Sequence, residues 1–129
     1  MNNVNRIKNL YQAFAAGDLD TVLATIDPDV VWIESEGIPY GGTFQGRDAV
    51  VEGVFQKIGA EWDNFAAQVE EYIDAGDRVI TLGHDSGTYK DTGKSMSAPT
   101  ASIWTFDNGK VVKFVQYIDT LKVVTATIV

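Results

Sequence analysis

The spacing of hydrophobic positions changes along this chain, from a helical period in its first half to a strand period in its second. In residues 3–16 apolar side chains recur three and four positions apart, and Gly17 follows them, so a helix ending at a left-handed glycine is expected. A second short helix should begin after Asp18 as its N-cap and end before Pro28. Residues 47–58 return to the helical period and predict a third helix.

The remaining segments have strand character. Residues 30–33 form a short apolar run of β-branched and aromatic residues and predict a strand. Residues 35–46 contain four glycines and a proline, and they predict either an irregular loop over a pocket or a short hairpin. Beyond residue 64, turn sequences that include Asn108-Gly109 divide the chain into four antiparallel strands, expected at 65–74, 78–90, 95–106 and 110–121. The β-prone tail 123–129 should extend the last strand or cross to a partner.

This order of elements, α-α-β-α-β-β-β-β, predicts an α+β fold in which a curved antiparallel sheet wraps around helices. Such a sheet forms a cone with one open mouth. The chain has 129 residues, which is the size of one domain, so a single domain over 1–129 is expected.

Composition limits the partners and the chemistry. Eighteen acidic against ten basic residues give a net charge of −8, which disfavours nucleic acid and acidic membrane surfaces as partners. With no cysteine and one histidine, a metal site of usual composition is not expected. No apolar signal core or membrane-spanning run is present, so we expect a cytoplasmic protein.

Five segments carry a family resemblance: 10–20, 27–32, 44–50, 104–111 and 117–120. In their order and spacing they resemble SnoaL-like polyketide cyclases and ketosteroid-isomerase-like proteins of the nuclear-transport-factor-2-like superfamily. The resemblance implies the conical fold, a homodimer, and a pocket for a small apolar or aromatic metabolite, without a cofactor. Members of the superfamily include isomerases, cyclases, epoxide hydrolases and domains with no catalysis.

The resemblance also implies candidate catalytic residues. Glu34 falls at the position of the general base of ketosteroid isomerase, while Leu10 and Ser102 stand where that enzyme has its oxyanion donors. Asp85 and Asp119 match the two catalytic aspartates of limonene epoxide hydrolase. Because SnoaL-type cyclases also use an aspartate near the last-strand position, Asp119 is the position that most templates share.

Strand register bears on the same candidates. A two-residue turn at Asn108-Gly109 pairs Thr100 with Tyr117 and turns Asp119 to the same face. A two-residue or four-residue turn around Thr92-Gly93 adds Asp85 to that face. A three-residue loop there would instead turn His84 inward and Asp85 outward. The sequence leaves this choice open.

A carboxyl group on an apolar wall has its pKa raised and can act as a general base near neutral pH. We therefore expect Asp119 to remove a proton, with Asp85 or His84 assisting and Glu34 as a further candidate. The side chains expected to line the pocket are Phe14, Trp32, Tyr40, Phe55, Thr100, Trp104 and Tyr117.

Three functions remain open. The first is a cofactor-free acid–base enzyme of isomerase, cyclase or epoxide-hydrolase type. The second is a module that binds a metabolite without transforming it. The third is a dimerisation module that pairs through an apolar sheet face, because both faces of the last strand carry apolar residues.

Overall fold

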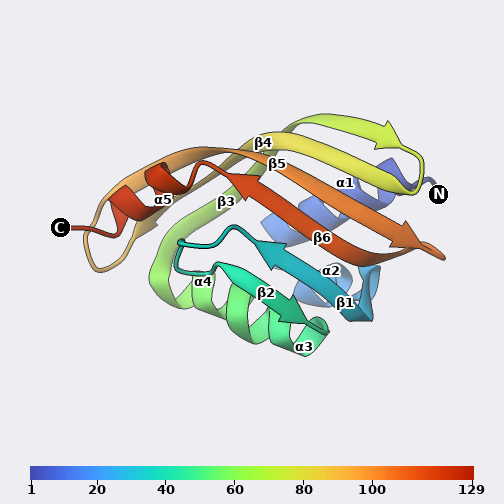
Figure 1. Ribbon diagram of the computed structural model, residues 1–129, viewed down its shortest axis with the longest axis horizontal. Helices are drawn as coiled ribbons and strands as arrows, with labels where there is room; N and C mark the ends of the chain where they lie inside the picture. The colour runs from blue at the N-terminus through green and yellow to red at the C-terminus, as the bar shows by residue number, and fades with distance from the viewer.

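Helices α1 to α4 lie on one side of a single curved sheet in the computed structural model, which describes residues 1–129 (Figure 1). The first two helices, α1 (Asn3–Ala15) and α2 (Leu19–Thr25), precede the first strand. The Asn2 side chain accepts a hydrogen bond from Asn5 N at 2.8 Å, and that of Asp18 accepts one from Thr21 N at 3.2 Å. Gly17 has φ +72° between them. Both helices therefore begin as the sequence pattern predicts, and α1 is followed by the predicted left-handed glycine. Helix α2 ends at Thr25, earlier than the predicted break at Pro28, which lies within β1 (Ile26–Glu34).

The third helical stretch is longer than predicted and is not uniform. It consists of α3 (Arg47–Val50), the π-helical segment η1 (Val51–Phe55) and α4 (Gln56–Glu61). A π-helical turn re-aims the side chains that it carries and is common at functional sites. Here it ends at Phe55. None of the helices has the length and apolar character that a membrane crossing requires.

The sheet has six strands in the order β2-β1-β6-β5-β4-β3. The strands are β1 (Ile26–Glu34), β2 (Gly42–Gln45), β3 (Trp62–Ala75), β4 (Arg78–Tyr89), β5 (Ser95–Asp107) and β6 (Lys110–Ile118). Neighbours are antiparallel, with the exception of the parallel pair β1 and β6. Both alternatives for residues 35–46 are present in part, because β2 pairs with β1 in a hairpin and residues 35–41 between the two strands form an irregular loop. The α+β class and the curved sheet are confirmed.

The C-terminal tail differs from the prediction. Strand β6 ends at Ile118, and residues Thr120–Ala126 form the helix α5. The buried residues Val123 and Ala126 are three positions apart, which is a helical spacing. A cap at the helix start and this buried stripe outweigh the β propensity of the tail, because propensity is a weak preference that tertiary contacts override.

The last hairpin contains an irregularity that the sequence reading missed. Asp107 pairs with Lys110 as expected, but the register shifts between Thr105 and Phe106, where Val112 is the extra residue of β6. One extra residue moves every later side chain of the strand to the opposite face. Thr100 therefore pairs with Ile118, not with Tyr117.

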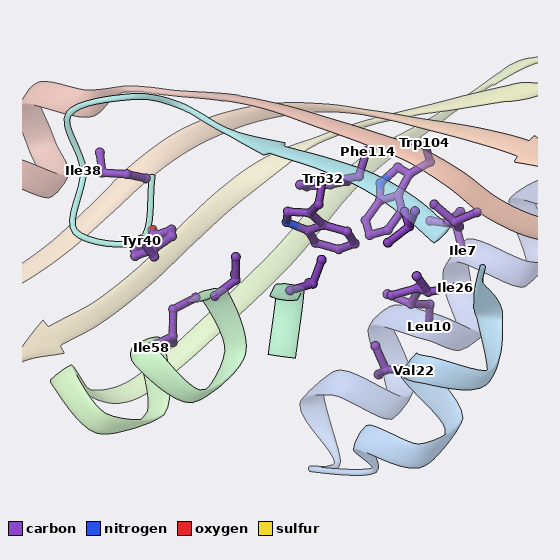
Figure 2. Close-up of a cluster of buried hydrophobic side chains, with 14 of the residues drawn as sticks. Ile7, Leu10, Val22, Ile26, Trp32, Ile38, Tyr40, Ile58, Trp104 and Phe114 are labelled. Atoms are coloured by element: carbon purple, nitrogen blue, oxygen red, sulfur yellow. The ribbon is translucent and has the colours of Figure 1, made fainter. Parts of the chain in front are cut away.

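Aromatic side chains fill the space between the concave sheet face and the helices. Trp32, Trp104 and Phe114 lie together beneath the sheet, and Leu10 and Val22 face them from α1 and α2 (Figure 2). The rings of Trp32 and Phe114 stack with centroids 4.0 Å apart, and Trp104 meets Trp32 edge to face at 5.6 Å. This cluster forms one wall of an internal cavity.

Candidate functional site

An apolar cavity of about 60 Å³ lies between the concave face of the sheet and the helices. The recess to which this cavity belongs, measured to the surfaces of its atoms and out to the open solvent, is about 520 Å³. Thirteen of its sixteen lining residues are hydrophobic, and the polar ones are Glu34, Asp85 and Gln116. The full lining is Leu10, Tyr11, Phe14, Val22, Trp32, Glu34, Tyr40, Val54, Phe55, Ile58, Phe65, Ala67, Asp85, Trp104, Phe114 and Gln116.

Glu34 is the last residue of β1 and is only 3% exposed. It lies two positions after Trp32, so both side chains point to the same face of the strand. The indole Nε1 of Trp32 donates a hydrogen bond to Glu34 Oε2 at 2.7 Å, while Oε1 has no partner. Burial raises the pKa of Glu34 to about 8, the charge of Asp85 adds to the rise, and the Trp32 hydrogen bond opposes it.

Asp85 brings a second carboxyl group to the cavity from β4 and is 5% exposed. It pairs with Ala98 of β5, in the register that turns its side chain inward. Burial raises its pKa to about 7, and a hydrogen bond from Gln116 acts in the opposite direction. Three strand spacings separate β4 from β1. The curvature of the sheet therefore brings the two carboxyl groups to one cavity.

Two further polar side chains at the cavity have unmet hydrogen-bonding capacity. The hydroxyl of Tyr40, in the loop before β2, is buried without a partner, and so is Oε1 of Gln116. Burial raises the pKa of Tyr40, and the charges of Asp85 and Glu34 raise it further. An unsatisfied buried polar atom costs about 1–3 kcal/mol. Three such atoms, counting Glu34 Oε1, lie in the wall of one cavity.

Tyr11 is a cavity residue that the sequence reading missed. Its hydroxyl lies 3.1 Å from Thr81 Oγ1, and the Trp104 indole donates to the same oxygen at 3.3 Å. Burial raises the pKa of Tyr11. The resemblance placed Leu10 at the position of a catalytic tyrosine, one residue away. Both residues belong to the apolar stripe of α1, and that stripe was the available signal.

The structure brings most of the predicted lining residues together and excludes two of them. Five of the seven line the cavity: Phe14, Trp32, Tyr40, Phe55 and Trp104. Tyr117 does not, because the extra residue in β6 turns its side chain to the outer face, where it is 61% exposed. Gln116 takes its place. Thr100 pairs with Gly83 and Ile118 and is not among the residues that line the cavity, so its expected lining role is also wrong.

The prediction that Asp119 faces the cavity is wrong. This residue follows the end of β6, is exposed, and serves as the N-cap of α5. Its carboxylate Oδ1 accepts a hydrogen bond from Lys122 N at 3.3 Å. A short acidic side chain after a strand and before a helical stripe is typical of a helix cap. Asp119 therefore contributes to the start of a helix and does not line the cavity.

His84 lies on the outer face of the sheet, next to Asp85 in sequence and opposite to it in direction. Its Nδ1 contacts Glu70 Oε1 of the neighbouring strand β3. Asp85 faces inward, as one of the two alternatives for the β4–β5 hairpin predicts, but the register differs from both: Asp85 pairs with Ala98, and not with Thr100 as a turn at Thr92-Gly93 would have it. No group of three or more His, Asp or Glu side chains comes together as a metal site anywhere in the chain.

Comparisons with known proteins agree with this architecture. Residues 7–114 match the family model of the SnoaL-like domain. A crystal structure of an NTF2-like protein from Burkholderia thailandensis superposes with a TM-score of 0.96 at 37% identity, covering 100% of this chain and 99% of that one. An NTF2-like protein of unknown function from Burkholderia pseudomallei gives a TM-score of 0.89 at 29% identity, covering 98% of each chain.

A third solved structure comes from co-crystallization with a small molecule. TerC, co-crystallized with polyporic acid, superposes with a TM-score of 0.86 at 25% identity and covers 96% of both chains. Among curated proteins, none matches this chain.

Proposed function

Because this chain belongs to the family of SnoaL-like domains, we propose that it binds a small, largely apolar or aromatic metabolite and transforms it by cofactor-free acid–base catalysis, with Glu34 as general base. The observation that carries this proposal is the unpartnered Oε1 of Glu34, a carboxyl oxygen buried in the wall of an apolar cavity. A mostly apolar cavity with a few convergent polar groups is the usual form of a small-molecule site.

The chemistry follows from the environments of the two carboxyl groups. A general base works best when its pKa lies near the working pH, and burial raises the pKa of Glu34 to about 8 and that of Asp85 to about 7. Glu34 removes a proton from a substrate C–H bond, and the electron pair stays on the substrate. The free Tyr40 hydroxyl then donates a hydrogen bond to the oxygen that gains negative charge. Asp85 delivers or accepts the second proton.

A solved relative supports a small organic ligand in this fold. TerC was co-crystallized with polyporic acid, and it shares 25% of its residues with this chain over nearly its whole length. Eight aromatic side chains line the present cavity, which favours a ligand with a flat apolar body.

The test uses proton exchange, which detects base catalysis without knowledge of the natural product. Aryl ketones, with and without an amino group, are incubated in D₂O, and loss of the C–H signal next to the carbonyl is followed by NMR. Glu34→Gln should slow the exchange by about 100-fold or more. Glu36→Gln, an exposed carboxyl group two residues away, is the matched control and should keep the wild-type rate. Equal rates for Glu34→Gln and wild type would refute the assignment.

A non-catalytic binding module is the second candidate. No Lys, Arg or His side chain lines the cavity, so a negative charge that develops on a substrate has no cationic partner there. Ketones that bind to the protein but show no exchange would favour this candidate over catalysis.

We also propose a homodimer that pairs through the outer face of the sheet. Ile103 and Val115 pair on that face, and the exposed Tyr117 lies beside them opposite Ala101. Sedimentation at micromolar concentration tests it, and a monomer would contradict it.

A further inference from the structure

Two buried carboxyl groups in this molecule have no counter-charge. Glu34 and Asp85 are 3% and 5% exposed, and neither contacts a Lys, Arg or His side chain. The only contact in the chain between oppositely ionisable side chains joins His84 and Glu70 on the outer face of the sheet. Buried charges in proteins are paired, and a buried carboxyl group without a partner tends to hold its proton instead, as the raised pKa values of both groups indicate. A cation in the cavity would allow these groups to ionise, and the chain itself supplies none there.

The unsatisfied atoms in the cavity wall also call for a donor. Glu34 Oε1 and Gln116 Oε1 are acceptors without partners, and the Tyr40 hydroxyl can accept as well as donate. An anionic ligand would bring further acceptors to this wall. A protonated amine instead brings N–H donors and a positive charge together.

The rest of the wall has the composition that binds organic cations. Eight of the sixteen lining residues are aromatic: Tyr11, Phe14, Trp32, Tyr40, Phe55, Phe65, Trp104 and Phe114. Aromatic faces attract cations through the negative charge above each ring, and tryptophan does so most strongly. The net charge of −8 on the chain adds a long-range attraction of the same sign.

From these features we propose that the ligand of the cavity is an organic cation, a protonated amine on a small aromatic or apolar body. The amine N–H donates to Glu34 Oε1 or Gln116 Oε1, and its charge is balanced by the two carboxylates and the indole rings. This inference rests on the proposed function only in placing the ligand in the same cavity. It goes further in naming the charge of the substrate, and a bound cation would also favour the ionised, base form of Glu34.

The pH dependence of binding follows from the titratable groups at the cavity. These are Tyr11 from α1, Glu34 from β1, Tyr40 from the loop before β2, and Asp85 from β4. The lining residues contributed by α2, the α3–α4 stretch, β3, β5 and β6 include none. A cation binds best when both carboxyl groups are ionised, so its affinity should rise from about pH 6 to 8.5, with release of protons to the buffer.

The experiment compares three probes with the same phenyl body: 2-phenylethylamine, which is a cation, 2-phenylethanol, which is neutral, and phenylacetate, which is an anion. Each is titrated into the full-length protein, and binding is followed by NMR through the Trp32 indole N–H, which reports on Glu34. At about pH 8 the amine should bind about tenfold tighter than the alcohol or more, and phenylacetate weakest. In the Glu34→Gln/Asp85→Asn variant, the amine should lose this advantage while the alcohol keeps its affinity.

Binding of the alcohol or of phenylacetate as tight as that of the amine would overturn the inference, and so would the absence of binding by all three. If the double variant does not fold, the affinities of the three probes for the wild-type protein still decide the question. The outcome is also separable from the catalytic proposal. If the protein prefers the cation but Glu34→Gln exchanges protons at the wild-type rate, the catalytic proposal is refuted and the inference stands. If Glu34→Gln slows the exchange but the protein shows no preference for the cation, the catalytic proposal stands and the inference is refuted.

Discussion

Replacing Glu34 by glutamine removes an ionisable group from the cavity wall with little change in shape. The amide oxygen of glutamine can still accept the hydrogen bond that Trp32 Nε1 donates to Oε2 at 2.7 Å. The variant therefore isolates the effect of the charge. Its consequence for stability can be worked out from the burial of the side chain.

Burial raises the pKa of Glu34 from its ordinary value of 4.5 to about 8 in the folded protein. Between these two pH values, the folded chain holds a proton that the unfolded chain has released. The free energy of unfolding must therefore fall as the pH rises through this window, by at most about 1.4 kcal/mol per pH unit from this group. The full contribution is at most about 5 kcal/mol, present below the window and lost above it. Glutamine contributes no such loss.

Urea unfolding of wild type, Glu34→Gln and the exposed control Glu36→Gln at about pH 5 to 9 measures this effect. Near pH 5 the three proteins should have similar free energies of unfolding. Above about pH 8, Glu34→Gln should be several kcal/mol more stable than the other two. Asp85, whose pKa burial raises from 3.8 to about 7, adds a slope of similar size in all three proteins, but only up to about pH 7. If the free energy of unfolding changed with pH in the same way in wild type and in Glu34→Gln, the raised pKa of the buried Glu34 would be refuted.

Two further substitutions test other parts of the fold. Asp119→Ala removes the N-cap of α5 and should lower the free energy of unfolding by about 1 kcal/mol. Its affinity for 2-phenylethylamine should equal that of wild type, and a large loss of affinity would show that Asp119 belongs to the site after all. Gly83→Ala puts a methyl group 1.9 Å from the backbone oxygen of Gln68, so it should cost about 2 kcal/mol or more in urea unfolding. Gly87→Ala in the same strand, whose nearest contacts would be 3.4 Å, is its control, and equal losses for both would contradict the close approach.

The elements that depend on local sequence were predicted well. The helix cap at Asp18, the left-handed Gly17 and the turn at Asn108-Gly109 each act over a few residues, and the structure contains all of them. The α+β class follows from the same periodicities. These features need no knowledge of distant contacts.

The candidate site was predicted only in part, because its geometry depends on long-range features. Glu34 and Asp85 come from strands that are not neighbours, and only the curvature of the sheet brings them to one cavity. The faces of Gln116 and Tyr117 depend on one extra residue in β6. A signal for it was present, because a regular ladder would have turned the charged Lys113 into the core.

Because Val112 has no partner, the inward-facing side chains of β6 stand at an odd-numbered position near the turn and at even-numbered positions along the cavity. The extra residue decides which row of side chains faces the cavity: if the same residues paired regularly from the turn, a lysine and a tyrosine would face inward in place of Phe114 and Gln116. A relative that lacks the extra residue would keep the same inward row, because a regular ladder would then place the later residues as the bulge places them here. An alignment without a gap at this point would pair residues that face opposite sides of the sheet.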